Sequence, residues 1–342
     1  MNAAALTLPT AVLMLIAAAA MSYSLLLLLR PLLLRYAMAL PNARSSHKTP
    51  TPQGAGIGVV AATVAISALA ALALDDIADR TLGIVLAAAV GIAIVGAVDD
   101  IKPVGVLPRL LLQAAAVTAI LIAIPADARV VPMLPFSLER ALLGLGAVWF
   151  VNLTNFMDGL DWITAAETVP VAAFIALFGV FGASSATEAV VALALCGAML
   201  GFAPLNKPVA KMFLGDVGSL AIGLLIAWML IGIAGRGHLA AALLLPLYYL
   251  ADATITLCLR LSRGEKVWVA HRTHFYQRAT QHGFSVMDTV TRIFAVNVAL
   301  GLLALATLIW TGLAVQIGAL ACGAALVAWL LYTFAKGRAS AA

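Results

Sequence analysis

The sequence predicts an all-α integral membrane protein with ten to eleven transmembrane helices and an active site on its cytoplasmic face. Of its 342 residues, 64% are hydrophobic and only 10% are charged, and the mean hydropathy is +1.08. Apolar runs of membrane-spanning length recur along the whole chain. No polar stretch is long enough for a soluble domain, so we expect one polytopic membrane domain over residues 1–342.

Eleven apolar runs are candidate transmembrane helices, because a helix of about 20 residues crosses a hydrocarbon core about 30 Å thick. The run at 138–151 is short and the run at 238–258 contains Pro246, so the expected count is ten or eleven. The first run lacks the features of a cleaved signal peptide and is expected to remain as a helix. The runs are roughly 7–29, 57–74, 81–98, 109–125, 138–151, 163–182, 186–204, 218–235, 238–258, 289–310 and 312–334.

The Lys and Arg residues divide unequally between the two sets of alternating loops. One set comprises 30–56, 99–109, 152–162, 205–217, 259–288 and the C-terminal tail, and it holds nearly all of them. Only Arg80, Arg129, Arg140 and Arg236 fall on the other side. The positive-inside rule therefore places the first set in the cytoplasm and the N-terminus outside. The net charge of +5 gives no reason to expect a nucleic acid partner.

The acidic residues follow the same partition. Those on the outer side are expected only to be solvated; they are Asp75, Asp76, Asp79, Asp127, Glu139 and Glu188. Five others fall in three cytoplasmic loops, among apolar or glycine-rich neighbours: Asp99, Asp100, Asp158, Asp161 and Asp216. Five carboxylates beside many cations on one face suggest a site for a metal ion and a phosphorylated ligand.

The densest polar segment is Asn152–Asp161, which reads N-L-T-N-F-M-D-G-L-D between two apolar runs. Its carboxylates and amide carbonyls are hard oxygen ligands of the kind that bind Mg²⁺. Gly159 permits a sharp turn or the close approach of a ligand. The alternative is a polar loop in which Asp and Asn only cap two helices.

Three further segments carry carboxylates toward the same face. The adjacent Asp99 and Asp100 end a predicted helix, where negative charge opposes the helix dipole, and this favours a functional role. Lys211 and Asp216 flank a short apolar stretch, and the glycines around Asp216 suggest an anion site at a helix N-terminus. Asp216 as a simple N-cap is the alternative. Asp252 lies within an apolar run and is either functional or paired, for example with Arg260.

Two cytoplasmic loops carry histidine beside cations. In the first, Arg44 and His47 are candidates to bind a phosphate or an anionic lipid headgroup, although the charges can also serve only topology. In the second, A-H-R-T-H-F-Y-Q-R contains His271, Arg272 and His274. A zinc half-site would need further soft ligands, so a diphosphate-binding loop is favoured.

Taken together, these loops resemble the polyprenyl-phosphate N-acetylhexosamine-1-phosphate transferases. That family also includes the phospho-muramoyl-pentapeptide translocases of cell-wall synthesis. The resemblance covers nearly the whole chain in family order, and every motif falls on the predicted cytoplasmic face. The motifs are P-N-x-R-S-S-H…P-T-P-x-G-x-G, V-D-D, N-x-x-N-F-M-D-G-x-D, N-x-P-x-A-K-x-F-x-G-D-x-G-S and H-R-x-H-F-Y-Q-R.

The resemblance implies an enzyme of the bacterial inner membrane that moves a sugar 1-phosphate from a UDP-N-acetylhexosamine to undecaprenyl phosphate. UMP would leave, Mg²⁺ or Mn²⁺ would be required, and the product would start O-antigen (lipopolysaccharide) or other surface polysaccharide synthesis. The carrier phosphate is already a nucleophile, so the protein would chiefly neutralise and align two anions. A homodimer is compatible with this expectation.

Residue roles implied by the resemblance follow the matching positions. Asn155 and Asp216 correspond to Mg²⁺ ligands, and Asp99 and Asp100 to an acidic pair that orients or deprotonates the carrier phosphate. Asp161 corresponds to a residue at the uridine end, and Asp158 supports the loop. Substrate contacts, many of them to phosphate oxygens, are implied for Asn152, Lys211, His271, Arg272, His274, Arg44 and His47.

The sequence departs from the family pattern at two places. Trp162 stands where most relatives have glycine, and H-R-T-H replaces the histidine triplet of the muramoyl-pentapeptide branch. The H-R-T-H motif, together with the short final loop, favours the O-antigen and polysaccharide branch, with UDP-GlcNAc, UDP-FucNAc or UDP-QuiNAc as the donor; Trp162 leaves the choice among these sugars open.

Two other classes of function remain as alternatives. A secondary transporter would place charged residues near the membrane midplane, whereas here only Asp252 is a candidate for such depth. A non-catalytic, lipid-binding homologue would have lost an acidic motif, and none of them is missing.

Overall fold

The computed structural model describes residues 6–39, 50–74, 80–267, 269 and 271–338. Arg44 and His47 lie outside these ranges, as do Asp75, Asp76 and Asp79. The elements are α1 Leu8–Tyr36, β1 Met38–Ala39, β2 Thr51–Pro52, α2 Gly56–Ala73, α3 Arg80–Ile101, α4 Val106–Ala123, α5 Phe136–Met157, α6 Ile163–Phe178, a 3-10 turn Gly179–Phe181, α7 Ala186–Phe202, α8 Asp216–Gly235, α9 Leu239–Leu244, α10 Leu247–Ser262, α11 Phe275–Gln281, α12 Val286–Ile309 and α13 Leu313–Lys336.

The prediction of an all-α polytopic membrane protein is confirmed. In the described part of the chain nine helices are long and apolar enough to cross a membrane, and the apolar α7 is slightly shorter. The run expected at 238–258 is instead divided into α9 and α10 at Pro246. Proline lacks the backbone N–H and clashes with the preceding turn, so it ends a helix. The count is therefore nine to ten rather than ten to eleven.

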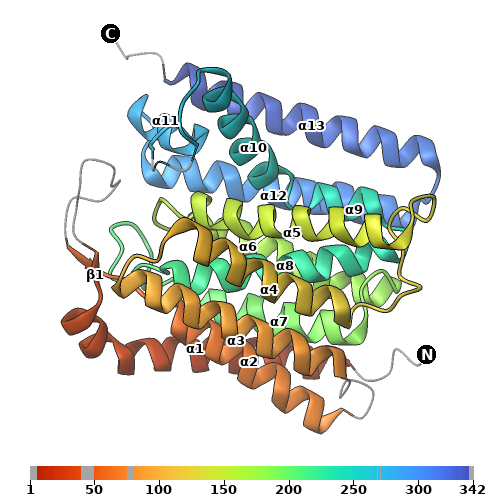
Figure 1. Cartoon of the computed structure of the whole chain (residues 1–342), viewed down its shortest axis with the longest axis horizontal. Helices are drawn as coiled ribbons and strands as arrows, with labels where there is room; N and C mark the ends of the chain where they lie inside the picture. The colour runs from red at the N-terminus through yellow and green to blue at the C-terminus, as the bar shows by residue number, and fades with distance from the viewer. Residues whose placement is uncertain (1–5, 40–49, 75–79, 268, 270, 339–342) are drawn as a thin grey trace.

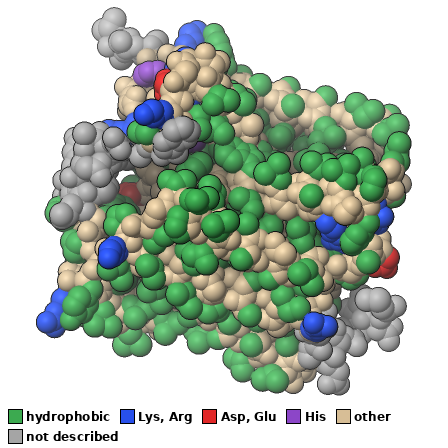
Figure 2. Space-filling view, viewed as in Figure 1, with side chains coloured by type: hydrophobic (Ala, Val, Ile, Leu, Met, Phe, Trp, Pro, Cys, Tyr) green, Lys and Arg blue, Asp and Glu red, His purple; other side chains and the backbone are tan. Residues whose placement is uncertain are grey.

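Helix α8 is the centre of the bundle (Figure 1). In the most hydrophobic window of α8, 94% of the residues are buried. The corresponding share is 22% in both α1 and α13, which lie at opposite edges of the view. A helix that is hydrophobic on every side needs protein contacts all round, whereas α1 and α13 leave apolar faces for lipid. On the face seen in Figure 2, charged side chains gather toward the two ends of the bundle and leave the middle hydrophobic.

Close backbone packing brings the end of α3 to the start of α8. A Cβ atom on Gly96 would lie only 2.4 Å from the backbone carbonyl of Asp216, so no larger residue fits there. The segment before α2 reaches the same place from another direction. Phe213 N–H donates to the Pro52 carbonyl at 2.8 Å, and Gly56 N–H donates to the Leu214 carbonyl at 2.8 Å. Segments far apart in the sequence thus meet at one end of the bundle.

At the other end of the bundle the acidic residues differ from expectation. Glu139 and Glu188 are 2% and 3% exposed rather than solvated. Glu139 is paired with Arg129, and it also accepts the backbone N–H groups of residues 130 and 131. Glu188 pairs with Arg236 at 2.8 Å. Each acid has a nearby arginine that compensates its burial, and a loop-by-loop count of charges does not reveal such pairs.

Candidate active site

The polar segment of Asn152–Asp161 begins inside a helix. Helix α5 continues to Met157, so its last turn and a half carries Asn152 and Asn155, which were expected in a loop. Asn152 is buried and its Nδ2 donates to Gln113 Oε1 at 2.6 Å. Asn155 instead faces the start of α8, where its Nδ2 donates to Asp216 Oδ1 at 2.7 Å and to Ser219 Oγ at 3.0 Å.

Arg109 joins two of the predicted site carboxylates. Its Nη1 lies 2.8 Å from Asp99 Oδ2 and 3.6 Å from Asp216 Oδ2. The side chain of Asp216 keeps 29% exposure while that of Asp99 keeps 9%. Arg109, at the start of α4, is the cation that allows these two acids to share a confined space.

The two adjacent aspartates at the end of α3 point to different partners, as expected for neighbours on a helix. Asp100 accepts the backbone N–H groups of Asp216 at 2.9 Å and Val217 at 3.2 Å. Helix α8 begins at Asp216 itself, and Gly215 in the capping position makes no side-chain bond. Asp216 is therefore a first-turn acid and not the N-cap, and the anion predicted at this helix terminus is the Asp100 carboxylate.

Asp216 and Asn155 fit a magnesium ion that is held mainly by substrate phosphates. Mg²⁺ commonly takes one or two protein oxygen ligands and completes its shell with water and phosphate. The partly exposed Asp216 carboxylate and the Asn155 amide lie side by side. Within the described residues, no three His, Cys, Asp or Glu side chains form a group that could hold a metal by itself. These two residues therefore suit a shared site and not an all-protein cage.

Asp158 follows α5 directly and connects the site to the start of α6. Thr164 Oγ1 donates to its Oδ1, and its carboxyl group also interacts electrostatically with Asp100 and Asp161. Burial, aided by the two neighbouring acids and opposed by the Thr164 bond, raises the pKa of Asp158 to about 7. Asp158 therefore titrates near neutral pH.

Asp161 and Trp162 attach this turn to the segment before α8. Asp161 Oδ2 accepts the Ala210 N–H at 2.9 Å. Trp162 donates its backbone N–H to Asn206 Oδ1 at 2.7 Å and its indole N–H to the Ala203 carbonyl at 2.5 Å. Trp162 is the one non-glycine residue with a positive φ, at 67°, in the described part of the chain. Because this conformation suits glycine, the indole bond offsets a backbone cost.

The histidine loop, His271–His274, leaves the His271 imidazole half-buried and buries that of His274. Thr273 N–H donates to His271 Nδ1 at 3.3 Å, which leaves Nε2 as the protonated nitrogen of the neutral ring. Burial and the adjacent His274 lower the pKa of His271 to about 4. His271 is thus a neutral hydrogen-bond donor at physiological pH, and Arg272 beside it carries the positive charge.

Asp252 anchors this loop. It is 0% exposed, and it accepts the Phe275 N–H at 3.0 Å, the Tyr276 N–H at 3.1 Å and a hydrogen bond from His274 Nδ1 at 3.2 Å. It therefore caps the short helix α11, whereas Arg260 pairs with Glu265. The ionisable residue noted inside an apolar run holds the histidine loop in place.

Tyr276 connects the histidine loop to residues 158–161, which we call the aspartate turn. Its hydroxyl donates to the Phe156 carbonyl at 3.0 Å, and a Cβ atom on Gly159 would lie 2.2 Å from the same hydroxyl oxygen. Its side chain interacts electrostatically with Asp158 and Arg272. This contact explains why Gly159 must be glycine, which the sequence attributed only to a turn or to ligand approach.

The structure thus brings most of the predicted site residues into connected contacts. Lys211 is exposed at the edge of this region. The sequence reading assigned no role to Arg109, Gln113 or Tyr276. For Arg109 and Gln113 the available signal was their spacing: they lie one helical turn apart, shortly after the Asp99–Asp100 pair. Arg44 and His47 lie outside the described residues, so their expected contacts with a phosphate or lipid headgroup remain predictions.

Comparison with known proteins identifies one matching family and several similar proteins. Residues 82–234 match glycosyl transferase family 4. The chain is similar to a decaprenyl-phosphate N-acetylglucosaminephosphotransferase of Mycobacterium leprae, at 28% identity over 75% of this chain and 73% of the relative. A protein of the same name from Mycobacterium tuberculosis is 29% identical over 75% of this chain and 72% of its own length.

A second group of relatives carries a different name. A phospho-N-acetylmuramoyl-pentapeptide-transferase of Thermoanaerobacter is 32% identical over 53% of this chain and 60% of its length. The family match includes α3, α5 and α8, which carry Asp99, Asn155 and Asp216. Residues 82–234 therefore belong to glycosyl transferase family 4, the polyprenyl-phosphate N-acetylhexosamine-1-phosphate transferases, which is related to the phospho-N-acetylmuramoyl-pentapeptide-transferases.

Proposed function

We propose that this protein transfers N-acetylhexosamine 1-phosphate from a UDP-sugar to a polyprenyl phosphate, with UMP as the leaving group. GlcNAc is the favoured sugar because the first relatives carry it in their names, and FucNAc and QuiNAc remain candidates. Undecaprenyl phosphate is the proposed carrier. The product would begin the synthesis of a lipid-linked glycan such as O-antigen.

One observation carries the proposal: Asp99 and Asp216 meet at Arg109 at one end of the bundle, and Asn155 donates to Asp216. Both substrates are phosphorylated, so the site must hold negative groups near one another. Asp216 and Asn155 are the proposed ligands of Mg²⁺, which would withdraw negative charge from the diphosphate when bound. Arg109 and Arg272 would neutralise phosphate oxygens.

The attacking group is an oxygen of the carrier phosphate, which forms a bond to the β-phosphorus of the UDP-sugar while the bond to UMP breaks. We assign Asp99, whose carboxylate lies against Arg109, to the orientation of that phosphate. Asp100 acts through the N-terminus of α8, where it fixes Asp216. His271 would donate its Nε2–H to a phosphate oxygen, Lys211 would add positive charge, and Asp161 would hold the donor-side loop.

The topology completes the proposal. The end of the bundle with the site is also the end that carries most Lys and Arg, so we place it in the cytoplasm with the N-terminus outside. UDP-sugars would reach the site from that side, and the polyprenyl chain would lie along the hydrophobic outer surface of the bundle.

The decisive experiment uses purified protein, undecaprenyl phosphate, Mg²⁺ and a panel of UDP-N-acetylhexosamines, with UMP release as the readout. Release with one sugar, lost in EDTA and in Asp216→Ala, supports the proposal and names the donor. Asp288→Asn is the matched control, because it removes an exposed carboxylate from the same side at α12. No release with any UDP-sugar from protein of intact thermal stability would refute the proposed reaction.

A further inference from the structure

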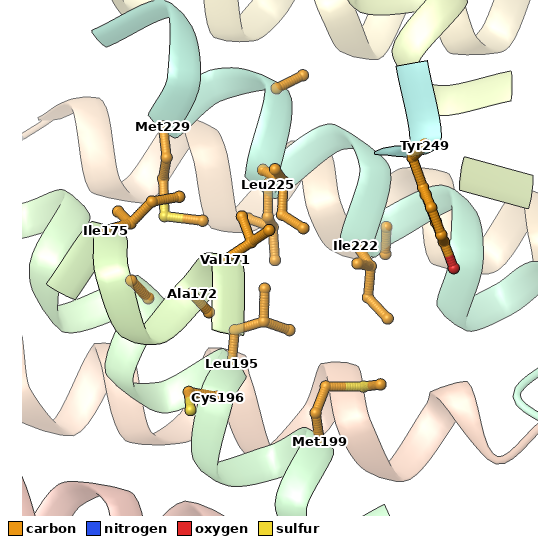
Figure 3. Close-up of a cluster of buried hydrophobic side chains, with 14 of the residues drawn as sticks. Val171, Ala172, Ile175, Leu195, Cys196, Met199, Ile222, Leu225, Met229 and Tyr249 are labelled. Atoms are coloured by element: carbon orange, nitrogen blue, oxygen red, sulfur yellow. The ribbon is translucent and has the colours of Figure 1, made fainter. Parts of the chain in front are cut away.

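A second set of buried polar groups lies inside the bundle, next to the aspartate turn. Glu167 of α6, Asn297 of α12 and Tyr249 of α10 are 2%, 1% and 0% exposed. Figure 3 shows Tyr249 at the edge of a cluster of otherwise hydrophobic side chains that includes Val171, Ile222 and Met199. The proposed reaction assigns no role to any of the three polar residues.

Of the five polar side-chain atoms in this set, only two have a partner. Asn297 Nδ2 donates to Glu167 Oε2 at 2.7 Å and to the Ala166 carbonyl at 3.1 Å. Glu167 Oε1, the Tyr249 hydroxyl and Asn297 Oδ1 make no direct hydrogen bond within the described residues. A buried polar atom without a partner loses its hydrogen bonds to water without replacement, so three in one place call for an explanation.

The surroundings of Glu167 determine its charge. In the described ranges no Lys, Arg or His makes an ion pair with it, and its electrostatic neighbours are the hydroxyls of Tyr248 and Tyr249. The remaining charged groups beside those tyrosines are the acids Asp158 and Asp252. An ionised carboxylate without a cation in a low-dielectric interior is far costlier than its neutral form. Glu167 is therefore a neutral carboxylic acid.

A neutral acid has one O–H donor, and the contacts decide which oxygen carries it. Oε2 accepts from Asn297, so the proton is on Oε1. The Tyr249 hydroxyl interacts with Glu167 electrostatically and with the Thr164 hydroxyl, although it makes no direct hydrogen bond to either. Thr164 in turn donates to Asp158 Oδ1. One bridging water on each side of the Tyr249 hydroxyl would complete the connection.

We propose that Glu167 is a positioning residue, the neutral start of a one-way hydroxyl chain that runs through Tyr249 and Thr164 to Asp158. Each hydroxyl in the chain accepts one hydrogen bond and donates the next, so the direction is fixed at both ends. The chain holds the Asp158 carboxyl, and with it the turn that contains Gly159 and Asp161. Cooperative chains of this kind are rigid when every member is satisfied.

The test compares two replacements of Glu167. Glutamine has nearly the same shape and, like a neutral acid, offers both a donor and an acceptor, so Glu167→Gln retains thermal stability and most of the activity. Glu167→Leu removes both groups and lowers kcat on the order of ten- to a hundredfold with little change in KM, because the turn shifts. If Glu167→Gln loses as much activity and stability as Glu167→Leu, the acid is ionised and the proposal is wrong.

The matched control is Glu188→Gln. Glu188 is similarly buried but lies 2.8 Å from Arg236, so its glutamine variant leaves a charge without its partner and lowers the melting temperature. Tyr249→Phe interrupts the chain and leaves Glu167 in place; it lowers kcat as Glu167→Leu does. A Tyr249→Phe enzyme with unchanged kcat would overturn the chain.

The kinetic comparison rests on the proposed function, whereas an infrared measurement does not. In the difference spectrum of wild type minus Glu167→Gln, without substrates, a carbonyl band of a protonated carboxylic acid is expected and should shift in D₂O. Its absence would refute the neutral acid even in an active enzyme. Its presence in a protein that releases no UMP would leave Glu167 neutral and refute the proposed reaction alone.

Discussion

Replacing Gly159 with alanine tests whether the contact between the aspartate turn and the histidine loop is catalytically important. The new Cβ would lie 2.2 Å from the Tyr276 hydroxyl oxygen, where ordinary contact begins at 3.4 Å. One of the two segments must therefore move by about 1.2 Å, and misplacement by about 1 Å can cost about a hundredfold in rate. We expect kcat to fall by about that factor.

The same change also strains the hydrogen bond from Tyr276 to the Phe156 carbonyl, which is worth about 1 kcal/mol. The assay is UMP release at saturating substrate, with thermal stability measured in parallel. Gly146→Ala is the matched control: it lies in α5, nothing stands within 4 Å of its added Cβ, and alanine favours the helix by about 0.5–1 kcal/mol. It should be fully active.

The double variant Gly159→Ala/Tyr276→Phe separates the clash from other effects. Removal of the hydroxyl relieves the closest contact, although the ring carbon at 3.1 Å stays tight, so activity should recover in part. The two substitutions should thus be clearly non-additive. Wild-type kcat in Gly159→Ala, or strictly additive losses in the double variant, would refute the assignment of this contact.

Three other predictions follow from contacts at the same end of the bundle. Asp252→Ala leaves the donors of α11 without their buried acceptor, so we expect loss of activity and faster proteolysis in the histidine loop, with α12 and α13 still protected; uniform cleavage would contradict this. Asp100→Ala removes the cap of α8 and should lower stability by about 1 kcal/mol in a thermal melt, while the exposed Asp288→Ala should change it less. The raised pKa of Asp158 means that folding favours its neutral form, so its stabilisation of the folded state is complete below about pH 4 and is lost as the pH rises through about 7. In a profile of melting temperature against pH, Asp158→Asn should remove that loss. A profile identical to that of the wild type would refute this role of Asp158.

The sequence was sufficient for the membrane class, the motifs and the family, because these depend on composition and local order. Composition predicted apolar spans, and the acids of three loops do converge on one end of the bundle. Boundaries were less certain: hydropathy ended the fifth span at 151, yet α5 continues to Met157, since asparagine and threonine remain helical when neighbouring helices satisfy them.

Partners across the bundle could not be predicted from the sequence. Nothing in V-D-D shows that one aspartate caps α8 while the other binds Arg109, because both partners lie elsewhere in the chain. Glu167 in an apolar run was a visible signal that was overlooked, although intramembrane acids are functional candidates by default. The oxygen that carries its proton depends on Asn297, which is 130 residues away and is placed only by packing.

The burial of α8 has a consequence for how this protein tolerates sequence change. Lipid accepts almost any apolar side chain, so in a deep mutational scan α1 and α13 should allow most exchanges among Leu, Ile, Val, Phe and Ala. Helix α8 is enclosed by protein along 94% of its most hydrophobic window. In such a buried helix, a single added or removed methylene group causes overpacking or a cavity and lowers stability. The hydrophobicity of α8 and α1 is nearly equal, yet their substitution profiles should differ sharply, and the helix that begins with Asp216 should be the slowest to diverge.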